Sequence, residues 1–279
     1  MKTRSIILSL IAAVTMVACV QTTEERIKAY EEAHEAMMNE YTQMMDSLAG
    51  NQEQAQAFYD DFVERYVKFN LKAAKKNPDN EVAVQALMNL RGLIDDEQSA
   101  EIFAAMSDEM LANEQVAALK AGLDARIATS EGNMFVDFTV NSVIGQTRSI
   151  PPQPIYGEVS LSDYVGNGKY ILLDFWSPWC GPCRREMPNI KAVYDKYKGD
   201  AFDVVSIAVW ERQPVDVTIK TAAELGMDWN QITNGQREPA QLYGVEGIPH
   251  LILFGPDGTI LKRGFHGAEI EEVVSSYLQ

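Results

Sequence analysis

The chain has 279 residues, of which 46% are hydrophobic, so it is long enough for two ordinary globular domains and too apolar to be disordered. Its formal net charge is −16 at pH 7, with 24 Lys and Arg against 40 Asp and Glu. This balance argues against sequence-independent nucleic-acid binding and against docking of a basic patch on an anionic membrane, because both need clustered positive charge.

Residues 1–18 have the pattern of a secretory signal peptide. Two basic residues precede an apolar stretch at 6–17, which is too short to span a bilayer comfortably. The end of this stretch, at 16–19, resembles a bacterial lipobox. The resemblance implies cleavage before Cys19, lipidation of that cysteine and a short polar tether at 19–23. A plain signal peptide, or an uncleaved anchor that happens to contain a cysteine, is the alternative.

Lipidation of Cys19 has consequences for the other two cysteines, because the chain contains three. Cys180 and Cys183 then remain as the only thiols, and an exported protein has no cysteine left for a separate structural disulfide. We therefore expect this pair to work in redox chemistry. Val20 after Cys19 lacks the usual inner-membrane retention residue, so we expect a periplasm-facing lipoprotein of the cell envelope, with the outer membrane favoured.

The segment after the tether has the spacing of amphipathic helices, with large side chains every three or four positions. The predicted helices run from Thr23 to Leu48 and over about 52–76, 79–91, 95–111 and 113–128. Together they predict an all-α domain at 24–130, built as a bundle or an array of helical hairpins. Residues 19–131 carry 22 Asp and Glu against 10 Lys and Arg, and a solvated acidic face is the simpler interpretation than a docking surface.

The pattern changes near 130–133, where we place the domain boundary. Residues 135–140 alternate like a β-strand, and the proline-rich segment 151–154 predicts a loop. The remainder alternates between predicted strands near 170–175, 203–210, 250–254 and 259–264 and predicted helices near 181–197, 215–226, 238–243 and 268–278. This alternation predicts an α/β domain at 132–279, with a central sheet covered by helices.

A Cys-x-x-Cys motif, Cys180 to Cys183, follows the predicted strand at 170–175 and opens the predicted helix at 181–197. A thiolate attacks a disulfide and a thiol does not, and a helix N-terminus lowers the pKa of a cysteine placed there. Cys180 is therefore the predicted attacking thiol, and Cys183 the resolving one.

A structural zinc site is the alternative for any Cys-x-x-Cys motif. Such a site would need a second pair of Cys or His at similar spacing, which the isolated His34, His250 and His266 do not supply. We expect neither a metal nor a cofactor.

The residues around the motif, FWSPWCGPCRREMP from Phe175 to Pro188, resemble the active-site segment of TlpA/ResA-like exported thiol–disulfide oxidoreductases of the thioredoxin fold. The resemblance covers about 132–279. Ile248-Pro249 stands where the family has its cis-proline loop, and the turn at 255–258 matches the hairpin between the last two strands. The resemblance implies a thioredoxin-like domain with a mixed central sheet, and nothing comparable is recognised in 20–130.

The resemblance also implies roles for two carboxylates. Asp174 matches thioredoxin's buried acid, which would accept or relay the proton as Cys183 becomes a nucleophile. A strand-end carboxylate that is hydrogen-bonded for structure is the alternative. Glu186 matches the acid near the dithiol and would share this proton work, or else it is an ordinary exposed carboxylate of the helix.

Four further residues are implied in client binding. Trp176 and Trp179 would form an apolar rim that packs against a partner, with a core position as the alternative for Trp176. Pro249 has no backbone N–H, which would leave the backbone of Ile248 free to pair with an extended peptide. His266 lies in a loop that resembles one bordering the active site, and we expect it to be a surface residue.

The function implied is reduction of protein disulfides by a lipid-anchored enzyme. The Gly-Pro pair between the cysteines resembles that of thioredoxin, whose potential of about −270 mV is strongly reducing. The expected partners are disulfide-containing client proteins and a membrane thiol donor, with no nucleic acid.

Two other functions compete with this one. In a scaffold lipoprotein, the helical domain would bind a partner and the thioredoxin-like domain would be an adapter. A peroxidase of the peroxiredoxin type would need a Thr two or three residues before a lone peroxidatic cysteine, which Ser177-Pro178-Trp179 does not provide.

Overall fold

The structure is a computed structural model that describes residues 22–278, so Cys19 and the predicted signal at 1–18 lie outside the described residues. The chain forms two compact units. The first comprises the described residues up to Ile94 together with Ala104–Met110, and the second comprises Asp95–Phe103 and the described residues from Leu111. This division does not follow the predicted boundary near 130–133, and the predicted domain ranges remain predictions. Across residues 22–278, no helix combines the length and apolar character needed to cross a bilayer.

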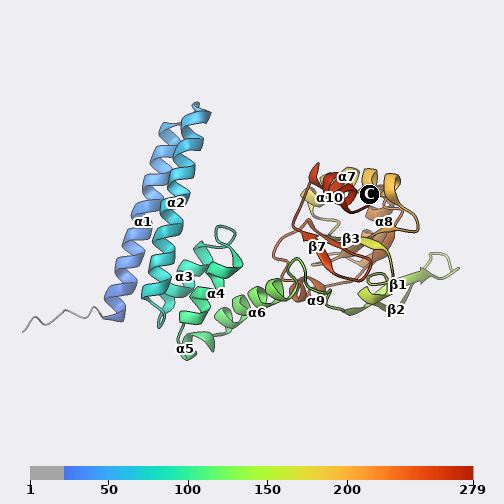
Figure 1. Ribbon diagram of the computed structural model, residues 1–279, viewed down its shortest axis with the longest axis horizontal. Coiled ribbons are helices and arrows are strands. Elements are labelled where there is room, and N and C mark those ends of the chain that lie inside the picture. The colour runs from blue at the N-terminus through green and yellow to red at the C-terminus, as the bar shows by residue number, and fades with distance from the viewer. Residues whose placement is uncertain (1–21, 279) are drawn as a thin grey trace, which may run out of the picture. The chain divides into compact units, whose positions relative to one another are not determined.

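The first unit is helical, as predicted, and its two long helices occupy the predicted ranges. The helices are α1 (Thr23–Ser47), α2 (Gln52–Lys76) and α3 (Glu81–Asn89), with α5 (Asp108–Leu111) at the end of the unit (Figure 1). The cap of α1 is Thr22, one residue before the predicted start. Its hydroxyl accepts a hydrogen bond from the Glu25 N–H, and the Glu25 carboxylate accepts one from the Thr22 N–H. Such a capping box stabilises a helix by about 1 kcal/mol.

The single helix predicted over 95–111 is wrong, because this segment forms α4 (Asp96–Ala105) and α5 with a break at Ser107. The Ser107 N–H donates to the Pro78 carbonyl at 2.9 Å, outside any helical pattern. The Ser107 hydroxyl accepts from the Met110 N–H at 3.3 Å and so starts a new turn. Serine side chains compete in this way with helical hydrogen bonds, which apolar spacing alone does not reveal.

The hairpin of α1 and α2 is held by aromatic pairs and by one buried polar network. Tyr41 and Phe62 lie 4.8 Å apart between ring centroids. The Tyr30 hydroxyl donates to Asn70 Oδ1 at 2.8 Å and accepts from Asn89 Nδ2 at 2.9 Å. Asn70 in turn donates to the Tyr66 carbonyl at 2.9 Å. The predicted helical stripes thus become the contact between α1 and α2.

The second unit contains a five-stranded mixed sheet of order β5-β4-β3-β6-β7. Figure 1 labels its strands β3 and β7. Its strands are β3 (Tyr170–Trp176), β4 (Phe202–Ala208), β5 (Asn230–Ile232), β6 (His250–Phe254) and β7 (Ile260–Arg263). Strand β3 runs parallel to β4 and antiparallel to β6. The helices are α6 (Glu114–Ala128), α7 (Gly181–Tyr197), α8 (Val215–Glu224), α9 (Glu238–Leu242) and α10 (Glu269–Tyr277). The predicted α/β domain with a mixed sheet is confirmed.

The segment before this sheet differs from its prediction. The strand predicted from 135 begins only at Thr139, as β1 (Thr139–Gln146), and it pairs with a strand that the prediction omitted, β2 (Pro154–Ser160). The residues before β1 bond elsewhere: the Val136 N–H donates to the Tyr243 hydroxyl, which donates to the Val136 carbonyl. Their apolar alternation therefore reflects packing on the main domain. Strand β5 was also missed, because it has only three residues.

The two faces of the sheet carry two separate cores, and alternate residues of β3 point into each. Leu172 and Trp176 belong to one core, with α7 and α10, whereas Leu173 and Phe175 belong to the other, with β1 and α9. Asp174 has the same parity as Leu172 and Trp176, since side chains alternate along a strand. The carboxylate therefore lies on the face that α7 covers.

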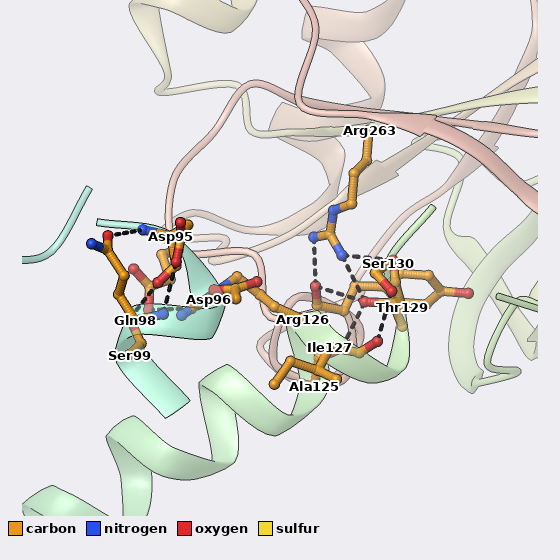
Figure 2. Close-up of polar contacts among 12 residues, drawn as sticks. Asp95, Asp96, Gln98, Ser99, Ala125, Arg126, Ile127, Thr129, Ser130 and Arg263 are labelled. Carbon is orange, nitrogen blue, oxygen red and sulfur yellow. Dashed lines mark hydrogen bonds and ion pairs between the residues drawn. The ribbon is translucent and has the colours of Figure 1, made fainter. Parts of the chain in front are cut away.

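The C-terminal end of α6 is bound to the sheet by a half-buried arginine of β7 (Figure 2). Arg263 donates to the Thr129 carbonyl at 2.8 Å, the Thr129 hydroxyl at 2.7 Å and the Tyr243 carbonyl at 2.8 Å. Earlier in the same helix, Arg126 forms ion pairs with Asp96 and Glu246. These contacts explain why α6 belongs to the second unit.

Candidate active site

The two cysteines lie at the junction between β3 and α7, as the sequence predicts. Cys180 is the N-cap of α7, and Cys183 sits in its first turn. A disulfide joins them, with an S–S distance of 2.10 Å and their Cα atoms 5.3 Å apart. Cys180 is 3% exposed and Cys183 is fully buried, so a partner can reach the Cys180 sulfur only at one edge.

The surroundings of Cys180 favour negative charge on its sulfur. The Cys183 N–H donates to Cys180 Sγ at 3.1 Å, and the sulfur faces the N-terminal end of the helix dipole. Both features stabilise a thiolate once the disulfide is reduced. The sulfur also lies 3.6 Å from the Ile248 carbonyl oxygen. In the disulfide it carries no proton, so this distance is a contact and not a hydrogen bond.

The loop opposite the disulfide contains the cis peptide bond Ile248-Pro249. Among the described residues, the Ile248 N–H has no hydrogen-bond acceptor. The chain continues directly into β6, where His250 pairs with Phe175 of β3. The loop is therefore fixed to the strand that precedes the dithiol, and it leaves backbone groups of Ile248 beside Cys180.

Asp174 is fully buried beneath α7. Its Oδ2 accepts a hydrogen bond from the Ser206 hydroxyl at 2.9 Å, and the same hydroxyl accepts from Trp229 Nε1 at 2.8 Å. Its Oδ1 has no partner among the described residues. Burial raises the pKa of Asp174 to about 7, the Ser206 hydrogen bond opposes this rise, and the charge of Glu186 adds to it. The carboxyl group can therefore gain or lose a proton near neutral pH.

Glu186 is half-buried and is tied to the loop that precedes α10. Its Oε1 accepts hydrogen bonds from the Gly267 N–H at 3.0 Å and from Asn189 Nδ2 at 2.8 Å. A hollow of about 350 Å³ lies beside it, lined by Pro182, Arg185, Glu186, Pro249 and His266. Glu186 and Pro249, two of the predicted site residues, therefore line the same hollow. His266 also lines it and is a surface residue, as predicted.

The two tryptophans of the predicted rim have different environments. Trp176 is fully buried, so it cannot contact a partner in this structure. Its position is that of a core residue, which was the alternative prediction for it. Trp179 is 36% exposed, and its Nε1 donates to the Trp210 carbonyl at 3.0 Å. The Arg212 guanidinium covers the Trp179 ring, 4.1 Å from the ring centroid.

Four residues of the site were missed from the sequence. Ser206, Trp229, Trp210 and Arg212 all come from segments after β3, and no motif marks them. Only the parallel pairing of β3 with β4 brings Ser206 opposite Asp174. A small polar residue within the apolar run of β4 was the one available signal, because buried hydroxyls need partners.

The region that contains this site is similar to a known protein family. Residues 132–263 match the family described as AhpC/TSA family. The matched region contains the mixed sheet and the dithiol, and its fold is thioredoxin-like. The described helical region before it lies outside the match.

Two relatives carry the name thiol-disulfide oxidoreductase. The chain is 27% identical over 154 residues to the thiol-disulfide oxidoreductase ResA of Geobacillus thermodenitrificans, covering 55% of this chain and 79% of that protein. It is 27% identical over 121 residues to ResA of Bacillus subtilis, covering 43% of this chain and 64% of that protein. Among solved structures, the thioredoxin domain of a thiol-disulfide oxidoreductase from Bacteroides vulgatus has 25% identity and a TM-score of 0.46, covering 54% of this chain and 99% of that one. By class, the chain is a thiol–disulfide oxidoreductase.

Proposed function

We propose that the protein is an exported, membrane-anchored enzyme that reduces disulfides of client proteins through Cys180 and Cys183. One observation carries the proposal: the Cys180 sulfur stands at the N-terminus of α7 and accepts the Cys183 N–H at 3.1 Å, in a disulfide that is accessible only at Cys180. This arrangement suits one attacking sulfur and one protected resolving sulfur.

The reaction is a balanced exchange of two electrons. In the reduced enzyme, the Cys180 thiolate attacks one sulfur of the client disulfide, a mixed disulfide forms and the other client sulfur leaves as a thiolate. The Cys183 thiolate then attacks Cys180 Sγ, closing the enzyme disulfide and releasing the second client sulfur. The client gains two electrons and two protons, and the enzyme is oxidised. A thiol reductant must restore the dithiol.

Asp174 supplies the proton step for the resolving thiol. Cys183 is buried and must lose its proton before it can attack. The Asp174 carboxyl lies on the same face of the sheet, and its pKa of about 7 allows it to accept a proton at neutral pH. Glu186 acts indirectly in this scheme, because its charge raises the pKa of Asp174 while its carboxylate holds the loop at Gly267.

The cellular location is proposed from the sequence of the N-terminal segment. The signal-like residues 1–18 and the lipobox-like residues before Cys19 support export and a lipid anchor. A protein with this anchor would face the periplasm, where clients carry disulfides and where a membrane thiol donor is needed. Incorporation of a labelled fatty acid tests the anchor, with Cys19→Ser as the control that must abolish labelling.

Reduction of insulin disulfides by the full-length protein in detergent micelles tests the enzymatic function. We expect turnover with dithiothreitol as the reductant, and loss of turnover in both Cys180→Ser and Cys183→Ser. Cys183→Ser should retain a mixed disulfide with its client, because the resolving sulfur is missing. Absence of turnover with any thiol reductant would favour the scaffold function instead.

The direction of the reaction depends on the reduction potential of the dithiol. We expect a value close to the roughly −270 mV of thioredoxin, because the same Gly-Pro pair separates the cysteines. Equilibration of the protein with glutathione buffers, followed by quantification of free thiols, measures this potential. A value near −120 mV would be that of an oxidant and would contradict the reductase proposal.

A further inference from the structure

Two arginines from different elements flank the dithiol. In the first turn of α7, a Cβ built on Gly181 would lie 3.6 Å from Nη1 of Arg185, so this guanidinium lies beside the residue between the cysteines. After β4, the guanidinium of Arg212 stacks on the Trp179 ring at 4.1 Å. Gly181 and Trp179 are the chain neighbours of Cys180, so each of the two positive charges lies beside a residue adjacent to the attacking cysteine.

Neither arginine is neutralised within the described residues. Some cations of the same unit have a carboxylate within 4.0 Å, namely Arg126, Lys191, Lys196, Lys198, Lys220 and Lys262. Others of the described residues do not, namely Arg148, Lys169, Arg184, Arg237 and Arg263. Arg185 and Arg212 form no such ion pair in residues 22–278, and both are exposed. Unpaired positive charge therefore stands next to the reactive sulfur of a chain whose net charge is −16.

Two carboxylates close to these arginines, one in the same hollow and one adjacent in the chain, accept hydrogen bonds from other groups. Glu186 shares the hollow with Arg185, but its Oε1 accepts from the Gly267 N–H and from an asparagine of α7. Glu211 precedes Arg212 in the chain, but its Oε1 accepts from the Thr218 hydroxyl at 2.9 Å. Burial also raises the pKa of Glu211 above its ordinary value. The arginines remain available to a ligand from solution.

We propose that Trp179, Arg185 and Arg212 form a client-recognition rim that selects disulfides flanked by Asp or Glu. This inference rests on the reductase function proposed above and names its substrate class. In the mixed disulfide a client cysteine is bonded to Cys180, and successive Cα atoms are about 3.8 Å apart. Client residues one to three positions away are therefore within reach of the chain neighbours of Cys180, beside which the guanidiniums lie.

The chemistry of the rim suits a carboxylate. A guanidinium presents a planar fork of N–H donors that matches a carboxylate, and stacking on an aromatic ring pre-organises it. The chain as a whole repels acidic clients at long range, but a Debye length of about 8 Å at 0.15 M salt screens distant charges. Contacts at the rim are closer than this, so the preference should persist at physiological ionic strength.

A pair of synthetic peptides tests the inference with the full-length protein in uncharged detergent micelles. Each peptide contains one intramolecular disulfide, and the two differ only in carrying Glu or Lys on both sides of each cysteine. The measured quantity is kcat/KM for each peptide at 0.15 M salt, with dithiothreitol as an uncharged reductant. We expect the Glu peptide to be reduced about tenfold more efficiently, mainly through a lower KM.

Variants assign the preference to the rim. Arg185→Gln and Arg212→Gln should each lower kcat/KM for the Glu peptide about threefold, and the double variant should abolish the preference. Arg212→Lys keeps the positive charge and should retain most of the preference for the Glu peptide. Arg148→Gln, in the loop between β1 and β2, is the matched control and should leave the preference unchanged. Circular dichroism establishes that each variant is folded.

The outcomes separate this inference from the reductase function. Reduction of both peptides with equal efficiency, or a preference that survives in the double variant, would overturn the recognition rim and leave the reductase function intact. Reduction of neither peptide by the wild-type protein would overturn the reductase function, and the inference with it.

Discussion

The two units each contain a buried polar network, and the two networks differ in completeness. In the helical unit, Tyr30, Asn70 and Asn89 satisfy one another, and Asn70 also bonds to a backbone carbonyl. In the thioredoxin-fold domain, Asp174 and Ser206 are linked, but Asp174 Oδ1 has no partner within the described residues. The first network has no group that ionises near neutral pH, whereas the second contains a buried carboxyl group.

The pKa values of the two networks also differ, because burial acts on groups with different ordinary pKa values. Burial raises the pKa of Tyr30 to about 12, so its hydroxyl stays neutral at every physiological pH. Burial raises the pKa of Asp174 to about 7, where both protonation states are populated. Perturbed carboxyl groups of this kind are expected at catalytic sites. The two networks therefore differ in whether they titrate near neutral pH, and mutations in each should behave differently with pH.

The largest expected effect is a pH-dependent stabilisation by Asp174→Asn. The pKa of Asp174 is about 7 in the folded state, above its value of about 3.9 in the unfolded chain, so ionisation opposes folding. In the wild-type protein, the contribution of Asp174 to the free energy of unfolding is fully present below about pH 4 and is lost as the pH rises through 7. At pH 8 the variant should be more stable by about 3 to 4 kcal/mol, with little difference at pH 4.

Urea denaturation of the oxidised protein at several pH values measures this effect. The same variant should slow closure of the mixed disulfide, because Asn cannot accept the proton of Cys183. Parallel stability curves for the two proteins between pH 4 and 8 would contradict the assigned pKa of Asp174.

Disruption of the network of Tyr30, Asn70 and Asn89 should destabilise the protein to the same extent at every pH. Asn70→Ala removes the partner of the Tyr30 hydroxyl and should destabilise the protein by about 2 to 3 kcal/mol, equally at pH 5 and pH 8. Asn39→Ala is the matched control: Asn39 lies on the exposed face of α1, and its replacement should change stability by less than about 0.5 kcal/mol. A loss that varied strongly with pH would show that this network also titrates.

A smaller effect is expected when the Asp174 network is made less complete. Ser206→Ala removes the side-chain hydrogen bond that the Asp174 carboxylate accepts among the described residues, and it leaves Trp229 Nε1 without its acceptor. We expect destabilisation of about 1 to 2 kcal/mol at neutral pH. The pKa of Asp174 should rise further, because the Ser206 hydrogen bond holds it down. Carbon-13 NMR titration of the Asp174 carboxyl group measures that change, and an unchanged pKa would contradict the assignment.

The smallest expected effect is at Glu186. Glu186→Gln removes a negative charge and should lower the pKa of Asp174, since that charge contributes to the rise. The amide oxygen can still accept from the Gly267 N–H, so the loop should stay in place. The same NMR titration measures the shift, and a rise in the pKa would exclude this electrostatic coupling.

Elements with strong local signals were predicted from the sequence. The two long helices occupy the predicted ranges because apolar side chains recur at helical spacing and Asn77-Pro78 stops the second helix. The dithiol was located because a Cys-x-x-Cys between a buried strand and a helix is a local pattern. The cis-proline loop was found through the resemblance, and the structure places Ile248 against Cys180.

Elements defined by long-range contacts were not predicted. Strand β2 follows a proline-rich loop, and β5 is only three residues long, so neither has a recognisable period. The segment 135–138 alternates like a strand but bonds to Tyr243 instead. The helix predicted over 95–111 breaks at Ser107, which bonds to Pro78. In each case a partner distant in the chain decided the local structure.

The sequence by itself determined the chemistry of the site: two cysteines three residues apart at a helix start, with an acid six residues before the first. The tertiary structure decided how that chemistry is controlled. Burial beneath α7 and the Ser206 hydroxyl set the pKa of Asp174, and the loop after β4 places Arg212 on Trp179. Burial, pKa and surface charge depend on the three-dimensional environment of a residue. Residues distant in the sequence make up that environment, so motif spacing does not reveal it.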